Sequence, residues 1–208
     1  METVEPERYN RNMPTPKKPS LDFGGLLTAE FEYIAQTMVE AHEDRARVAS
    51  FYLVAVGSFV AALFSAQFFN TNLSKILTTL LCILFFLLTL LGTSTIVQLG
   101  RFRAAWYASA VAMNKIKNFA MKHHPELEEA FPWKMGSIPK KYKLTSISFL
   151  QAIEVSLLSG LMLGSAIFFL QLTKNPSLTP PPWGIAIPAG IIAVGVEIAI
   201  YLWSLSWD

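Results

Sequence analysis

Two acidic residues interrupt otherwise apolar stretches of the sequence, Glu154 in SFLQAIEVSLLSG and Glu197 in AVGVEIAIYLW. An ionisable side chain inside a membrane-spanning helix is costly, so each is a candidate functional group. Glu154 lies seven residues after the start of its apolar stretch, and Glu197 lies six residues before the end of its own. At 1.5 Å per helical residue both are about 10 Å inside the same side of the membrane, and Thr93, Ser94 and Thr95 of another stretch lie at a similar depth. These groups predict a cation or proton site. The alternative is that the carboxyl groups bond to hydroxyls between packed helices and have only a structural role.

Other catalytic or metal-binding chemistry finds little support in the sequence. No nucleotide-binding glycine loop, nucleophile elbow, zinc signature or DNA-binding element occurs. His123 and His124 are adjacent, as are His42 and Glu43, and adjacent residues on a helix point in different directions. The only cysteine is Cys82, which excludes an intrachain disulfide. The sequence therefore predicts a protein that is not an enzyme, with no cofactor and no metal site.

The composition indicates an integral membrane protein. Of the 208 residues, 52% are hydrophobic and only 15% are charged, whereas soluble domains average about 25% charged residues. A bilayer core of about 30 Å requires about 20 apolar residues of helix. Four segments meet this length: 48–69, 76–99, 147–172 and 183–203. The predicted fold class is an all-α integral membrane protein with four transmembrane helices.

The basic residues predict the orientation of these spans. The segment up to Arg47 carries six Lys and Arg residues and the segment 100–146 carries nine, whereas the two connections on the other side carry only Lys75 and Lys174. Cytoplasmic segments of membrane proteins are enriched in Lys and Arg. We therefore expect both termini and the 100–146 segment to be cytoplasmic, in a multi-pass protein of the cell (inner or plasma) membrane.

Apolar residues continue at helical spacing beyond the first two spans, into sequence that is otherwise polar. Spacings of three and four place one stripe before the first span and another after the second. Two antiparallel helices could bury such stripes against each other. The sequence predicts that residues 26–123 form a helical hairpin extended into a cytoplasmic, coiled-coil-like stalk. The stalk-packing residues are Leu27, Phe31, Ile34, Met38, Phe102, Trp106, Met113 and Ile116.

The third span carries four small residues at strict four-residue spacing, Ala152, Ser156, Gly160 and Gly164. Such a ridge allows another helix to approach closely. We expect it to pack within the chain, against the adjacent fourth span, although contact between copies remains an alternative. Together these two spans form a second hairpin within residues 147–208.

The remaining segments are polar. Residues 1–25 contain several prolines and no apolar signal-peptide core, and are expected to be a disordered cytoplasmic tail. Residues 124–146 form a basic and aromatic loop, in which Lys140, Lys141 and Lys143 are expected to contact anionic lipid headgroups. The net charge of +2 is too small and too scattered to indicate nucleic acid as a partner.

The order of stalk helix, span, short link, span and stalk helix over residues 28–123 resembles the SLATT family of prokaryotic two-span membrane domains. The local similarity is strongest in RFRAAWYASAVAMNKIKNF, which follows the second span. The resemblance implies a membrane effector, with pore formation as one mode of action, driven by an attached sensor or a nucleotide-signalling partner. This chain differs from that plan in having two further spans and no recognisable sensor domain.

Three functions are compatible with these features. The leading hypothesis is a non-enzymatic membrane module that acts by oligomerisation, as a pore or effector. The second is an accessory or scaffold subunit of a larger membrane complex, docked through the stalk. The third is a small proton-coupled transporter that uses Glu154 and Glu197. The expected partners are membrane lipids and either further copies of the chain or other subunits of a complex.

Overall fold

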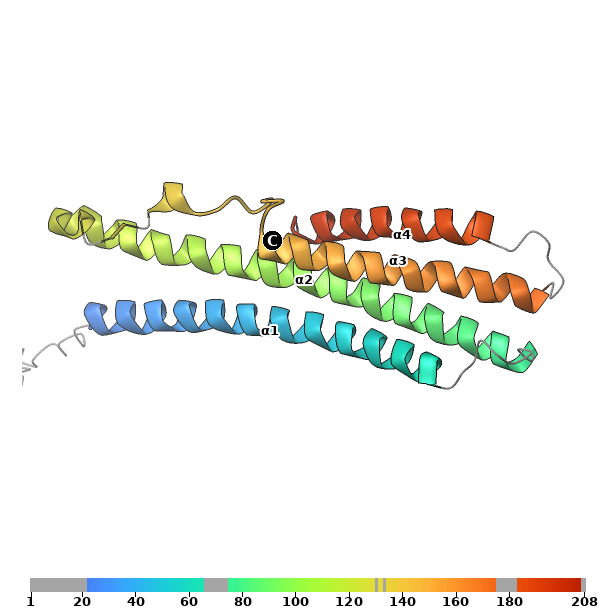
Figure 1. The fold of residues 1–208 in the computed structure, drawn as a ribbon. Helices are drawn as coiled ribbons and strands as arrows, with labels where there is room; N and C mark the ends of the chain where they lie inside the picture. The colour runs from blue at the N-terminus through green and yellow to red at the C-terminus, as the bar shows by residue number, and fades with distance from the viewer. Residues whose placement is uncertain (1–21, 66–74, 130, 133, 175–182, 207–208) are drawn as a thin grey trace, which may run out of the picture.

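The computed structural model describes residues 22–65, 75–129, 131–132, 134–174 and 183–206, and contains four long helices (Figure 1). Two short 3₁₀ turns, η2 (Pro125–Glu128) and η3 (Met135–Ser137), lie between the second and third helices. No strand occurs in these described ranges. The long helices are α1 (Phe23–Ser65), α2 (Lys75–His123), α3 (Ile147–Lys174) and α4 (Trp183–Ser204).

The prediction of four helices long and apolar enough to cross a membrane is confirmed. Helix α1 has 43 residues and helix α2 has 49 residues. Each is continuous through its polar half and its apolar half. Asp22 starts α1, because its side-chain Oδ1 accepts a 3.0 Å hydrogen bond from the backbone N–H of Gly25, as N-cap residues do. Most of the predicted tail, residues 66–69 of the first predicted span and the proline-rich connection at 175–182 lie outside the described residues.

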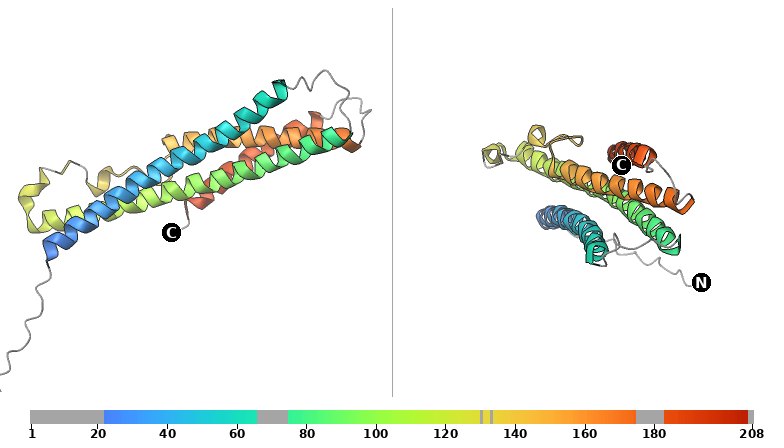
Figure 2. Two further views of the ribbon diagram at one scale, coloured as in Figure 1. Left: turned by 90° about the horizontal axis from the view of Figure 1, so that it is seen from below. Right: turned by 45° about the vertical axis from the view of Figure 1, so that its right-hand side comes forward.

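Helix α2 is the central element of the molecule. It contacts each of the other three long helices, whereas α1 packs mainly on α2. Helices α3 and α4 lie beside one half of α2, so α1 and α2 project together beyond them (Figures 1 and 2). At the far end of this projection the rings of Phe23 and Phe119 meet edge to face, with centroids 5.8 Å apart.

The predicted stalk residues lie on or beside the contact between α1 and α2. Ile34 is buried, and the other seven are partly exposed: Leu27, Phe31, Met38, Phe102, Trp106, Met113 and Ile116. The most buried side chains of α2 along this contact are Arg103, Ala110 and Asn114. These buried residues of α2 therefore form a line beside the predicted apolar stripe. The small side chain of Ala110 in this buried line allows α1 and α2 to approach closely.

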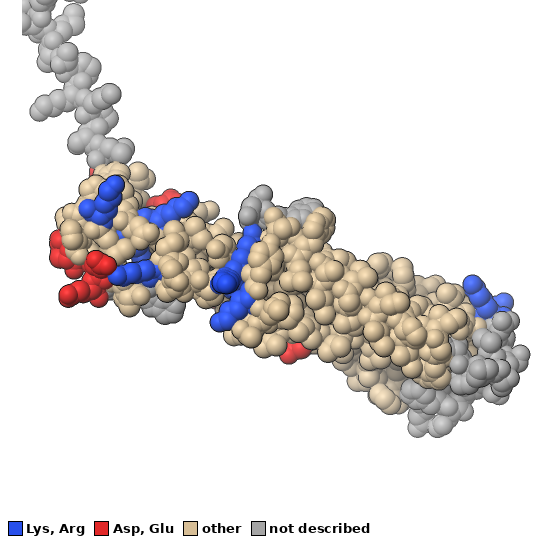
Figure 3. Space-filling view, turned by 90° about the horizontal axis from the view of Figure 1, so that it is seen from above, with Lys and Arg blue, Asp and Glu red and all other residues tan. Residues whose placement is uncertain are grey.

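The four-helix half has a continuous apolar interior and an apolar exterior. Tyr52, Ile96, Leu99 and Met162 are almost completely buried in it. Large apolar side chains also cover its outside, and Figure 3 shows this half almost without charge between a band of Lys and Arg and a basic patch at its tip. A helix that is hydrophobic on all sides is typical of a lipid environment.

The predicted ridge of small residues on α3 faces the interior of the four-helix half. Ala152, Ser156 and Gly160 are buried and Gly164 is half-buried. A Cβ at Gly160 would lie 2.6 Å from the carbonyl oxygen of Gly190 in α4. The backbones of α3 and α4 therefore touch within the chain, which only glycine permits at this position.

The segment between α2 and α3 folds back along α2. The ammonium group of Lys134 lies 2.7 Å from Glu128 Oε1, and this hydrogen bond and charge lower the pKa of the Glu128 carboxyl. Further along, the carbonyl oxygen of Lys140 accepts a 3.2 Å hydrogen bond from Arg103. Lys140 and Lys143 are exposed and Lys141 is half-buried. All three lie a few residues before the start of α3 at Ile147.

Candidate intramembrane polar site

Glu197 of α4 is the centre of a buried polar cluster. Only 3% of its surface is exposed. Its Oε1 accepts hydrogen bonds from the hydroxyls of Ser159 in α3, at 2.6 Å, and Thr93 in α2, at 2.9 Å. Three helices thus meet at a single carboxylate oxygen.

The remaining long helix, α1, contributes Tyr52, which is fully buried. A Cβ at Gly92 would lie 2.6 Å from Ser159 Oγ and 2.8 Å from the Tyr52 hydroxyl, so both oxygens face the same point on α2. The absence of a side chain at Gly92 makes room for them. The Tyr52 hydroxyl and Glu197 Oε2 are both buried, and neither has a hydrogen-bond partner in the part of the chain that the structure describes.

The two hydroxyl donors have a choice of acceptor. Thr93 Oγ1 lies 3.1 Å, and Ser159 Oγ 3.3 Å, from the backbone carbonyl oxygen of Thr89, in addition to their contacts with Glu197. Each hydroxyl has only one hydrogen to donate. The cluster can therefore rearrange when the carboxyl group gains or loses a proton. The polar side-chain atoms of the cluster are all oxygens, the type that hard cations prefer.

Helical periodicity explains why Glu197 faces inward. The buried residues of α4 are Ala186, Gly190, Glu197, Tyr201 and Ser204, at spacings of four, seven, four and three. Residues at such spacings share one face of a helix. Glu197 is the carboxylic acid on this face, so packing of α4 against α2 and α3 buries it.

Comparison of the chain with family models, curated proteins and solved structures finds no match.

The structure brings together Glu197 and Thr93 of the predicted site, but not the other three residues. Glu154 is exposed on α3, and Ser94 is exposed on α2. Thr95 is buried, but its hydroxyl donates to the carbonyl of Leu91 in its own helix. The reason is helical phase: five residues separate Glu154 from Ser159, which places them about 140° apart around the helix.

Two members of the cluster, Tyr52 and Ser159, were not among the predicted site residues. Ser159 follows Ser156 in VSLLSG, and Tyr52 is the tyrosine of the first apolar stretch. Polar residues within an apolar stretch are the signal that could have identified both of them. Their inward direction depends on the packing of four helices and could not be read from spacing alone.

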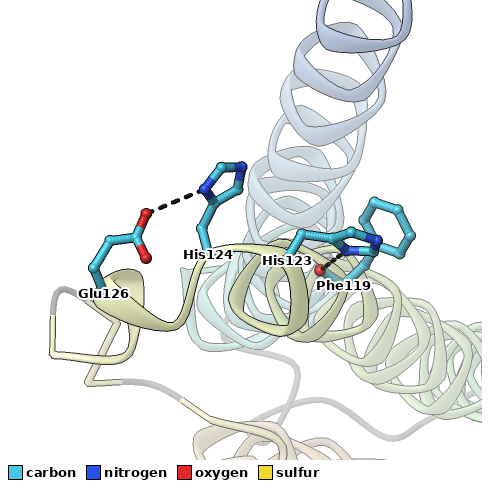
Figure 4. Close-up of polar contacts among 4 residues, drawn as sticks. All are labelled: Phe119, His123, His124 and Glu126. Atoms are coloured by element: carbon cyan, nitrogen blue, oxygen red, sulfur yellow. Dashed lines mark hydrogen bonds and ion pairs between the residues drawn. The ribbon is translucent and has the colours of Figure 1, made fainter.

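The histidine pair at the end of α2 forms a separate and exposed group. His123 Nδ1–H donates to the carbonyl oxygen of Phe119 at 2.9 Å, whereas His124 Nδ1 lies 3.1 Å from Glu126 Oε1. Figure 4 shows the two imidazole rings pointing in different directions. Within the described residues, no group of three or more His, Cys, Asp or Glu side chains is placed to hold a metal ion.

Proposed function

We propose that the chain is a multi-pass protein of the cell membrane that acts as a homo-oligomeric pore or effector module and not as an enzyme. The apolar halves of the four helices span the bilayer, and the polar ends of α1 and α2 form a cytoplasmic stalk. The distribution of Lys and Arg supports cytoplasmic termini. The resemblance of the first hairpin to the SLATT family supports an effector role.

The observation that carries this proposal is the exposed carboxyl group of Glu154 in an apolar helix face. Glu154 shares this face of α3 with Leu150, Leu157 and Leu161, which are 53%, 56% and 61% exposed. An ionisable side chain inside a membrane-spanning helix and exposed to lipid is costly. A second copy of the chain that covers this face would remove the carboxyl group from lipid and direct it to a shared interface or aqueous axis.

A groove beside this face supports contact between helices of different copies. It has a volume of about 270 Å³ and lies between α3 and α4. Leu157 and Leu161 line it together with Gly160, Gly164 and Gly190. Because Gly160 and Gly190 already contact each other within the chain, the exposed side chains of Leu157 and Leu161 are the ones that a helix of another copy could meet here.

Conductance of the purified protein in planar bilayers tests the proposal. We expect discrete currents whose unitary conductance or cation selectivity changes in Glu154→Gln, because the substitution removes a charge from the shared axis. Glu30→Gln, an equal change of charge at an exposed residue in the polar half of α1, is the matched control and should conduct like the unmodified protein. Cross-linking in the membrane should give an oligomer.

Silent bilayers over a range of pH and voltage, together with a monomer in cross-linking, would contradict the proposal. That result would favour the scaffold function. In that case a charge at Phe31, Met38, Trp106 or Met113, along the contact of α1 with α2, should prevent assembly with the larger complex.

Glu197 favours a second candidate, a small proton-coupled transporter. A buried carboxyl group held by two hydroxyls that can turn to another acceptor is suited to the uptake and release of a proton. In proteoliposomes, uptake driven by a proton gradient should be saturable and should be lost in Glu197→Gln, since glutamine keeps the hydrogen-bond acceptor but cannot ionise. Uptake that persists unchanged in Glu197→Gln would exclude this function.

A further inference from the structure

Two arginines come together at the border between the polar and apolar halves of the molecule. Arg45 of α1 donates a 2.6 Å hydrogen bond to Ser148 Oγ, at the start of α3. Arg103 of α2 donates to the carbonyl of Lys140 and lies over the ring of Trp106, 4.7 Å from its centroid. Only 7% of Arg103 is exposed, and Ser148 is fully buried.

Arg45 is half-buried, its guanidinium also lies 3.0 Å from His42 Nδ1, and its charge interacts with that of Arg103. Neither arginine forms an ion pair within the ranges that the structure describes, and each has a buried Nε without a hydrogen-bond partner there. Burial, and then the charge of Arg103, lower the pKa of Arg45, which lies outside the predicted spans. A buried cation and a half-buried cation that repel each other without a counter-charge are unfavourable unless an anion binds to them.

The surroundings of the pair offer a hydroxyl group and an apolar border. Tyr201 is buried in α4 with its backbone against Gly100, three residues before Arg103, and Ser148 supplies a hydroxyl. Next to them the chain enters the apolar half, where α3 begins at Ile147 and α4 ends at Ser204. Exposed apolar side chains surround this level, namely Leu144, Ile147, Leu150 and Trp203.

We propose that Arg45 and Arg103 form a binding site for the phosphate group of an anionic phospholipid. Two guanidinium forks match the geometry of phosphate oxygens, and arginine favours such bidentate contacts. A lipid suits the site better than a soluble phosphate because the apolar side chains at the same level can contact its acyl chains. The bound phosphate supplies the counter-charge that the pair lacks.

This inference rests on the proposed insertion of the apolar halves into a membrane. It differs from a general attraction of Lys140, Lys141 and Lys143 to an anionic surface, because it assigns one lipid to the buried Arg103 and the half-buried Arg45. The conductance test of Glu154 does not involve these arginines. A negative result in the lipid-binding test therefore does not contradict the proposed pore, and a negative result in the conductance test does not contradict the lipid site.

Binding of short-chain phosphatidylglycerol to the purified full-length protein in neutral detergent tests the site. Phosphatidylcholine of the same chain length and inorganic phosphate are the comparison ligands, and native mass spectrometry reports the bound lipid. We expect phosphatidylglycerol to bind at least about tenfold more tightly than either comparison ligand. The double variant Arg45→Gln, Arg103→Gln should lose this preference.

Arg47→Gln is the matched control, because Arg47 is a neighbouring arginine with a 74% exposed side chain that pairs with Asp44. It should bind phosphatidylglycerol within about twofold of the unmodified protein. If the glutamine variant does not fold, as judged by helical circular dichroism, Arg45→Lys, Arg103→Lys keeps the charge and should still weaken binding. An equal loss in Arg47→Gln, or inorganic phosphate binding as tightly as the lipid, would overturn the proposal.

Discussion

Gly160→Ala is expected to destabilise the protein by about 1–3 kcal/mol, although alanine is the better helix former. A Cβ at this position would lie 2.6 Å from the carbonyl oxygen of Gly190 and 2.5 Å from Val194 Cγ2. Because one of these atoms belongs to the backbone, it cannot move aside without separating α3 from α4. Unfolding of the purified protein in mixed micelles, followed by circular dichroism, measures the loss.

Gly195→Ala provides the control, since Gly195 is exposed on α4 and an added Cβ would meet no described atom within 4 Å. Helix propensity alone should then make this variant more stable, by up to about 1 kcal/mol. The two substitutions are chemically identical and should change stability in opposite directions. Equal stability of both variants would show that the backbone contact of α3 with α4 is not formed in the purified protein.

Glu197→Lys is expected to prevent folding or to cost about 3–5 kcal/mol, because it places an uncompensated cation in the interior. The hydroxyls of Thr93 and Ser159 now donate to the carboxylate. They are neutral and cannot balance the charge of a lysine. The fraction of protein that remains monodisperse and helical after extraction measures the effect.

Glu154→Lys is the same substitution at a similar distance from the end of its span, but on an exposed helix face. A lysine there can extend along the helix towards the membrane surface, as long charged side chains do. It should therefore be recovered as a folded chain. Similar losses in both variants would contradict the burial that distinguishes Glu197 from Glu154.

The four long helices could be predicted from the sequence because each contains an apolar stretch long enough to cross a membrane. The packing of the Gly160 ridge on α4 followed from its four-residue spacing and from the adjacency of the two helices. The buried line on α2 was harder to identify. It contains Arg103 and Asn114, and hydrophobicity alone assigns such residues to the surface.

The candidate site could be predicted only in part, since depth can be counted along a helix but direction depends on its neighbours. Thr93 and Glu197 lie at a common depth and also face each other. Glu154 lies at a similar depth but on the outer face of α3. Tyr52 enters the cluster because Gly92 leaves space beside it, and this relation between two helices is not encoded in the spacing of either one.

The polar cluster also joins the two helical hairpins of the chain. Tyr52 and Thr93 belong to the first hairpin, whereas Ser159 and Glu197 belong to the second. Thr93 can hydrogen-bond to Thr89 in its own helix, but both donors to Glu197 come from other helices. Helices of membrane proteins form first and associate afterwards. The carboxyl group of Glu197 therefore gains its partners only when α4 packs on α2 and α3, so this residue contributes to the association of the helices and not to the formation of its own helix.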